Sequence, residues 1–81
     1  TIMVSDTEYQ GYSLNPDWKQ QVMTQTILAG GTATFYVRDV DAPTPAEVTT
    51  LAEGPKLIRV PRNGYYKVVT TGSATVYHDW S

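Results

Sequence analysis

Cysteine is absent from this 81-residue chain, and histidine occurs only once, as His78. Without cysteine the chain can form neither disulfides nor thiolate zinc sites, which disfavours a small secreted protein held together by disulfides. One histidine cannot supply a histidine cluster for a metal ion. We therefore expect no metal and no cofactor. Because a domain this small usually gains stability from such groups or from a partner, the composition indicates association with other proteins or with further copies.

Excess positive charge and long apolar runs are also missing. The six Lys and Arg residues are scattered singly and the net charge is −2, whereas a nucleic-acid-binding domain usually carries a basic stripe. No apolar run approaches the roughly 18 to 20 residues of a membrane-spanning helix, and the start, TIMVSDTEYQ, lacks the pattern of a signal peptide. Thr1 is a small residue of the kind that commonly follows a removed initiator methionine. We expect a protein that binds neither nucleic acid nor membrane and is used without export.

Catalytic motifs are the third absence. The chain has no GxSxG, Walker or dinucleotide-binding pattern. His78 and Asp79 are adjacent, and neighbours on a strand point to opposite faces, so they cannot act together as an acid–base pair. Asp39 and Asp41 alternate as ligands of a hard cation do, but the fuller oxygen set that such an ion needs is missing. These absences predict that the protein is not an enzyme.

Strand-forming residues dominate what is present. Threonine occurs twelve times and tyrosine six times, and β-branched and aromatic residues favour strands. Residue pairs typical of turns separate pieces of about strand length. These pairs are Gly30–Gly31, Gly54–Pro55, Asn63–Gly64 and Gly72–Ser73. The composition therefore predicts an all-β fold.

Two internal similarities suggest a recurring unit. TILAGGTATFYV, residues 26–37, resembles TTLAEGPKLIRV, residues 49–60, and GTATFY, residues 31–36, resembles GSATVY, residues 72–77. The matches suggest one recurring unit of a strand, a glycine turn and a second strand. We therefore expect hairpins in series.

Hairpins in series predict a small antiparallel β-sandwich, jelly-roll or immunoglobulin-like, of six to seven strands. We assign residues 18–81 to this single sandwich domain and residues 1–17 to an N-terminal arm or edge strand. Such an arm, if ordered, is expected to take its order from a neighbouring molecule.

Two segments fit both a helix and a strand. In residues 44–53 a capping box and Pro45 are typical of a short helix, but the β-branched run from Val48 to Thr50 favours a strand. In residues 15–28, Asn15 and the following proline could begin a helix. Alternating side chains in that segment favour a strand from about residue 19 instead.

Alternation along the predicted strands separates inward from outward side chains. The set expected in the core is Ala33, Phe35, Val37, Tyr66, Val68, Thr70, Ala74, Val76 and His78. The set expected outside is Thr34, Tyr36, Arg38, Tyr65, Lys67, Val69, Thr75, Tyr77 and Asp79. A turn at Asn63 and Gly64 would thus leave Tyr66 inside and Tyr65 partly exposed.

The outward tyrosines and an arginine are residue types enriched in interface hot spots. The candidate protein-contact residues are Tyr36, Arg38, Tyr65, Tyr77, Trp80, Ile2 and Val4. Cross-strand pairing within one sheet explains outward aromatic rings equally well. Exposed rings also stack on sugars, and the candidates for that role are Trp18, Tyr36, Tyr77 and Trp80.

One segment resembles a known kind of module. VPRNGYYKV is similar to the segment that opens a late strand in small jelly-roll and sandwich domains, including complement-type and tumour-necrosis-factor-like domains and many bacteriophage head and tail proteins. The matching residues are Val60, Pro61, Gly64, Tyr65, Tyr66 and Val68. The cysteine-free, Thr-rich chain as a whole resembles small phage virion proteins that decorate or cement the capsid shell.

That resemblance implies a structural virion protein, assembled in the host cytoplasm, that binds the major capsid protein or another virion protein. It further implies a homo-oligomer, with a trimer favoured, and an arm that could add a strand to the shell protein. The alternative function is a carbohydrate- or surface-binding β-sandwich module of a tail or cell-wall protein.

Overall fold

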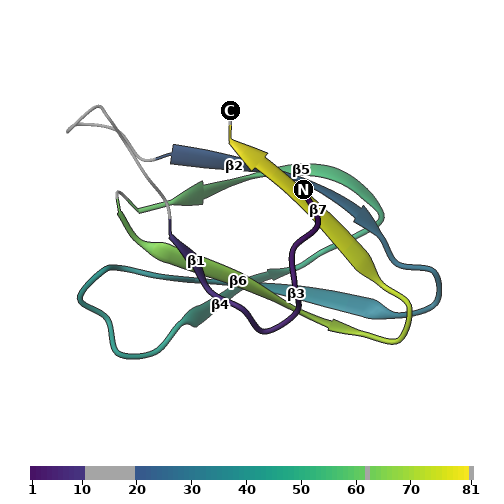
Figure 1. Ribbon diagram of the computed structural model, residues 1–81, viewed down its shortest axis with the longest axis horizontal. Coiled ribbons are helices and arrows are strands. Elements are labelled where there is room, and N and C mark those ends of the chain that lie inside the picture. Colours follow the sequence, from purple (N-terminus) through teal and green to yellow (C-terminus); the bar gives the residue numbers. More distant parts are fainter. Residues whose placement is uncertain (11–19, 62, 81) are drawn as a thin grey trace.

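Two antiparallel sheets face each other in the computed structural model, which describes residues 1–10, 20–61 and 63–80 (Figure 1). One sheet has the strand order β1-β6-β3-β4 and the other the order β5-β2-β7. The strands are β1 (Tyr9–Gln10), β2 (Gln20–Ile27), β3 (Thr32–Arg38), β4 (Ala46–Thr50), β5 (Gly54–Val60), β6 (Tyr65–Thr71) and β7 (Thr75–Trp80). The predicted small antiparallel β-sandwich is confirmed. Both segments that also fitted a helix contain strands, β2 and β4, where the structure describes them.

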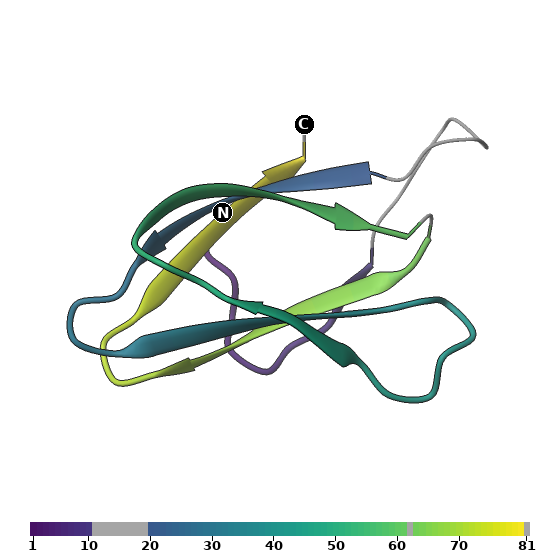
Figure 2. The same ribbon diagram turned by 180° about the vertical axis from the view of Figure 1, so that it is seen from behind.

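The glycine turns join strands of different sheets (Figure 2). Only β3 and β4 follow each other in the sequence and also pair with each other. The expectation of hairpins in series was therefore wrong. The similar segments 26–37 and 49–60 nevertheless share a structure, because each leaves one sheet, turns at a leucine and a glycine, and enters the other sheet. Turns of this kind place sequence neighbours across the core from each other rather than side by side.

Close backbone approach explains two of the glycines. A Cβ on Gly31 would overlap the carbonyl oxygen of Thr71, and a Cβ on Gly64 would lie 2.7 Å from that of Arg38. Asn63 takes the left-handed conformation, with φ of 56°, and Gly64 N–H donates to the Pro61 carbonyl at 2.8 Å. The Asn63–Gly64 turn was predicted, and it directs β6 so that Tyr66 enters the core.

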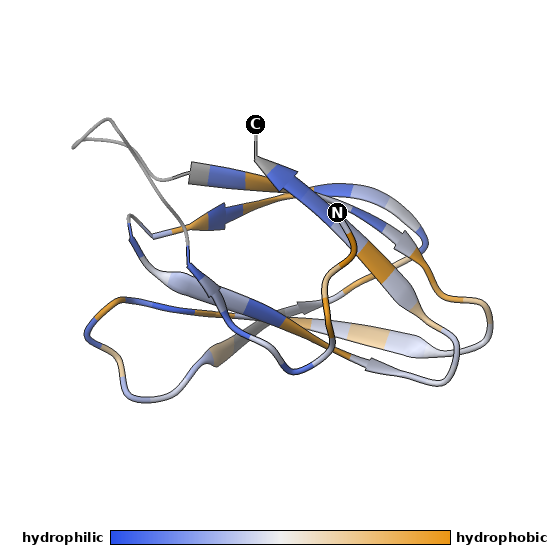
Figure 3. Cartoon of the chain, in the orientation of Figure 1, coloured by the Kyte–Doolittle hydropathy of each residue, from blue (hydrophilic) through white to orange (hydrophobic). Residues whose placement is uncertain are grey.

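The core lies between the two sheets, and the strands show alternating hydrophobic and hydrophilic bands (Figure 3). Its buried members are Met3, Val22, Ala33, Phe35, Leu51, Ile58, Val60, Tyr66, Val68 and Val76. Every β3, β6 and β7 residue in this list was placed inward by alternation. The buried Thr24 donates its hydroxyl to the Lys56 carbonyl, at 3.1 Å. Sequence alternation therefore located the part of the core that β3, β6 and β7 supply, and it did not assign Met3, Val22, Leu51, Ile58 and Val60.

The N-terminal residues lie against their own domain. The chain starts beside β7, where Ile2 bridges to Tyr77 and Met3 N–H donates to the Val76 carbonyl at 2.8 Å. It then crosses to the other sheet, where Tyr9 and Gln10 form β1 at the edge beside β6 (Figure 1). Residues 1–10, which we call the N-terminal clip, therefore contact both sheets of their own domain. The rest of the predicted arm, residues 11–17, lies outside the described residues.

Candidate protein-contact surfaces

The structure divides the predicted contact residues between two opposite faces. Tyr36, Arg38 and Tyr65 project from the outer face of the four-stranded sheet, next to the core residues Phe35 and Tyr66 that point inward. The remaining contact candidates do not join them there. Tyr77 projects from the outer face of the three-stranded sheet, with Ile2 bridged to it, and Val4 follows on the same N-terminal clip. The predicted single patch of Tyr36, Arg38, Tyr65 and Tyr77 is therefore two separate surfaces.

The structure describes neither tryptophan side chain. Trp18 lies outside the described residues, and Trp80 is described only as the backbone end of β7, paired with Val22. As sugar-stacking candidates, Tyr36 and Tyr77 lie on opposite faces, so these two rings cannot form one platform.

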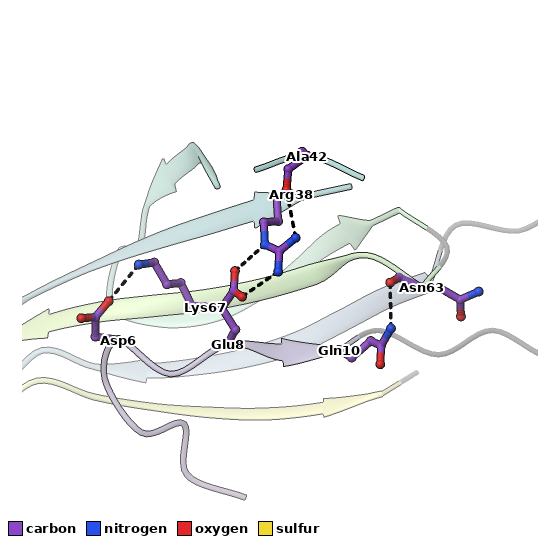
Figure 4. A network of polar contacts seen from close by, with 7 residues as sticks. All are labelled: Asp6, Glu8, Gln10, Arg38, Ala42, Asn63 and Lys67. Atoms are coloured by element: carbon purple, nitrogen blue, oxygen red, sulfur yellow. Dashed lines mark hydrogen bonds and ion pairs between the residues drawn. The ribbon is translucent and has the colours of Figure 1, made fainter. Parts of the chain in front are cut away.

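Arg38 is held by the N-terminal clip (Figure 4). Its Nε and one terminal nitrogen donate to the two carboxylate oxygens of Glu8, at 2.7 and 2.9 Å, and the other donates to the Ala42 carbonyl at 3.0 Å. The guanidinium also lies 4.0 Å from the centre of the Tyr65 ring, a cation–π distance. The hydrogen bond from Arg38 lowers the pKa of Glu8 and raises that of Arg38. The guanidinium that we predicted for a partner already has several partners within the domain.

Lys67 makes the second link between the clip and this face. Its Nζ donates to the Asp6 carboxylate at 2.8 Å, which raises the pKa of Lys67, and lies 5.5 Å from the centre of the Tyr36 ring. In the register of β3 and β6, Tyr36 lies opposite Lys67, and Arg38 lies opposite Tyr65. Aromatic rings and cations thus alternate across the two strands. The outer face of the four-stranded sheet is a polar network used for holding residues 6–10 in place.

The outer face of the three-stranded sheet carries bare apolar side chains instead. Met23 and Leu57 lie opposite each other in the β2–β5 register and are 49% and 55% exposed. Ile27 and Tyr77 are exposed on the same face, because they alternate with the buried Thr26 and Val76. Ile2 extends this row beyond β7 through its bridge to Tyr77. Five of the seven large apolar side chains that are exposed in the described residues lie on this face, namely Ile2, Met23, Ile27, Leu57 and Tyr77.

A shallow groove of about 300 Å³ runs along the open edge of this face. It is lined by Met23, Thr24, Pro55, Lys56 and Leu57. Strand β5 has β2 on one side and no further described strand on the other. The groove is thus open to a protein side chain laid on the sheet.

Sequence reasoning missed Met23, Ile27 and Leu57. The signal was available, because Val22, Thr24 and Thr26 alternate with Met23, Gln25 and Ile27 within one strand. Likewise Leu57 and Ile58 are adjacent in β5, so one of the two must face outward. Tyrosine and arginine were selected by residue type, and of these Tyr36, Arg38 and Tyr65 have contacts within the domain.

His78 belongs to an aromatic cluster under the clip. Its Nδ1 shares a hydrogen bond of 2.8 Å with the Tyr66 hydroxyl, and its ring lies 4.7 Å from that of Tyr9. Tyr66 stacks on Tyr9 and on Phe35. Burial lowers the pKa of His78, helped by the nearby terminal ammonium, and burial also raises the pKa of Tyr66 to about 12. The inward placement of His78 expected from alternation agrees with its bond to the core residue Tyr66.

No metal-binding group emerges from these surfaces. Within residues 1–10, 20–61 and 63–80, no three His, Asp or Glu side chains are placed to hold an ion. Asp39 and Asp41 lie exposed in the loop between β3 and β4. No helix in the described part of the chain is long and apolar enough to cross a membrane.

No protein-family model matches the chain, and neither the curated proteins nor the solved structures compared with it give a significant match.

Proposed function

We propose that the protein is a non-enzymatic structural protein that acts through protein–protein contacts, as a decoration or cement protein of a phage capsid. One observation carries the proposal, namely the cluster of exposed apolar side chains on the outer face of the three-stranded sheet. A contiguous apolar surface on a small domain typically marks a site of protein association. Lys56, Arg59 and Asp79 at the edges give this surface the polar rim that interfaces usually have.

The opposite face supports the same function in a different way. Its ion pairs hold the N-terminal clip against the four-stranded sheet, and backbone hydrogen bonds join the clip to β7, so the domain offers a preformed shape. A preformed surface binds without the entropic cost of ordering a segment. A cement protein has to add buried area across a seam of the shell, and rigid sandwiches with an apolar face fulfil that requirement. The resemblance of the VPRNGYYKV segment to sandwich modules of virion proteins selects the capsid as the partner.

The test is binding to capsid shells assembled without this protein. We expect the purified protein to bind such shells and to raise their resistance to heat and dilution. Leu57→Glu places a charge in the apolar face and is expected to reduce occupancy at least about tenfold. Val40→Glu is the matched control, since Val40 is also about half exposed but lies in the β3–β4 loop. Shells that neither bind the protein nor gain resistance would overturn the proposal, and binding to a glycan array in their place would establish the sugar-binding alternative.

A further inference from the structure

The edges of the three-stranded sheet carry charges of opposite sign on its outer face. Arg59 projects from β5 at one edge and Asp79 from β7 at the other, and both side chains are exposed. Strand β2 lies between them and contributes Met23, Gln25 and Ile27 to the centre of the face. Beyond β7 the terminal ammonium of Thr1 donates to the His78 carbonyl at 3.4 Å. The outer face itself is an apolar centre with one cationic side chain, Arg59, on one flank and one anionic side chain, Asp79, on the other.

This pattern is complementary to itself. A two-fold axis parallel to β2 brings two such faces together with β5 of one copy over β7 of the other. In the strand register, Asp79 lies level with Met23 and Leu57, and Arg59 lies two residues beyond Leu57. Two residues correspond to about 7 Å along a strand, a distance that an arginine side chain spans. Each Arg59 therefore reaches the Asp79 of the other copy, twice per pair of copies.

We propose that the outer face of the three-stranded sheet binds a second copy of this chain, in a two-fold pair with β5 over β7. This inference rests on the proposed function, in which the apolar face first joins two copies and the pair is the form that binds the shell. Asp79 also has an interaction within its own chain, and a carboxylate accepts several hydrogen bonds, so it can serve both. Turning the axis perpendicular to the strands would stack β5 on β5 and bring like charges together, which disfavours that arrangement.

The size of the face sets the expected affinity. Three strands about 4.8 Å apart and about seven residues long cover roughly 14 by 23 Å in projection. A standard interface removes about 800 Å² of accessible surface from each partner. The projected area of about 320 Å² is well below that size, so we expect weak pairing, with a dissociation constant in the micromolar region or above.

Sedimentation velocity over a concentration series of the full chain tests the pair directly. We expect a reversible dimer, and Leu57→Glu is expected to raise its dissociation constant at least about tenfold, with Val40→Glu unchanged. A monomer at every concentration up to about 1 mM, a trimer, or a dimer that Leu57→Glu leaves intact would each overturn the proposal. Circular dichroism and the unfolding midpoint of each variant separate lost pairing from lost folding.

A charge exchange tests the orientation. Arg59→Glu alone and Asp79→Arg alone each place like charges at both contacts, so each variant is expected to dimerise at least several-fold more weakly. Mixing the two variants restores opposite charges at both contacts, and we expect a mixed dimer close to the original affinity. Failure of the mixture to restore dimerisation would overturn the two-fold arrangement. A protein that binds shells as a monomer would refute this inference and retain the proposed function, whereas a dimer that binds no shell would refute only the function.

Discussion

The two outer faces of the sandwich are built from different side chains and differ in what those side chains already contact. On the four-stranded sheet, Arg38 and Lys67 are paired with Glu8 and Asp6 from the N-terminal clip, and the tyrosines lie against these cations. On the three-stranded sheet the large exposed side chains are apolar, and the clip lies beside β7 at the edge of this face, where Ile2 bridges to Tyr77. The polar face, which resembles an interface by residue type, has its cations paired within the domain, whereas the other face leaves its apolar side chains exposed.

Substitution of a buried residue in the N-terminal clip should lower the free energy of unfolding most. Met3 is 4% exposed and lies in the core, whereas Val4 is 61% exposed. We expect Met3→Ala to lower the free energy of unfolding by about 2 to 4 kcal/mol, because it leaves a cavity. Val4→Ala, the matched control, should change it by no more than about 0.5 kcal/mol. Urea denaturation measures the free energy of unfolding of both variants. Equal losses would show that Met3 of the clip contributes no more to the core than the exposed Val4.

Tyr66→Phe should have the next largest effect. It removes the hydroxyl that bonds to His78 Nδ1 and leaves the ring stacked between Tyr9 and Phe35. The loss of one partly buried hydrogen bond is expected to cost about 1 to 2 kcal/mol in the same urea experiment. Tyr65→Phe on the outer side of β6 is the control and is expected to cost less. A Tyr66→Phe variant as stable as the original would mean that the clip does not depend on this bond.

Acidification should weaken the same region. Because burial lowers the pKa of His78 in the folded protein, the unfolded chain binds a proton at higher pH than the folded one. Stability is therefore complete above pH 6.5, the ordinary value for histidine, and falls as the pH decreases from there toward the lowered pKa. The chain has no other histidine. Thermal unfolding between pH 7 and 5 should show this decline, and His78→Gln should flatten it.

Glu8→Gln should have a smaller effect that depends on salt. It removes one charge of the Arg38 pair but keeps an amide oxygen that can accept a hydrogen bond. Exposed ion pairs contribute little to stability and are screened by salt. We expect the loss in free energy of unfolding to be smaller than that of Tyr66→Phe. This loss should decrease as the salt concentration rises from about 0.05 to 0.5 M. A loss independent of salt would mean that packing of the Arg38 side chain, and not its charge, holds the clip.

Leu57→Gln should have the smallest effect on folding. The side chain is 55% exposed and lies on the outer face of the three-stranded sheet. At a protein concentration low enough to keep the chain monomeric, we expect a change within about 0.5 kcal/mol. If this variant unfolds as readily as Met3→Ala, the face belongs to the folding core and the contrast between the two surfaces fails.

Period-two alternation made much of the sandwich predictable. It placed Phe35 and Tyr66 inside and Tyr36 and Tyr65 outside, and each of these positions is confirmed. It could not say which sheet a strand joins, because both sheets have the same period. Tyr36 and Tyr77 occupy equivalent places in GTATFY and GSATVY and yet project from opposite faces.

The candidate contact surfaces were less predictable than the core. The bond between Glu8 and Arg38 joins residues 30 positions apart, and no local pattern marks such a pair. The cation–π contact of Arg38 with Tyr65 arises only from the pairing of β3 with β6. Strand pairing therefore brings together side chains whose contacts the sequence alone does not indicate.

The turns that cross between the sheets have a consequence for how the chain reaches this structure. Since only β3 and β4 are neighbours in both sequence and sheet, every other strand pair must bring together distant parts of the chain. Closing such loops costs entropy before any contact compensates it, so topologies of this kind fold slowly. The β3–β4 hairpin is the one element that can form early by itself. We expect refolding on a time scale of milliseconds to seconds, with strands β2, β5 and β7 joining only as the two sheets close on each other.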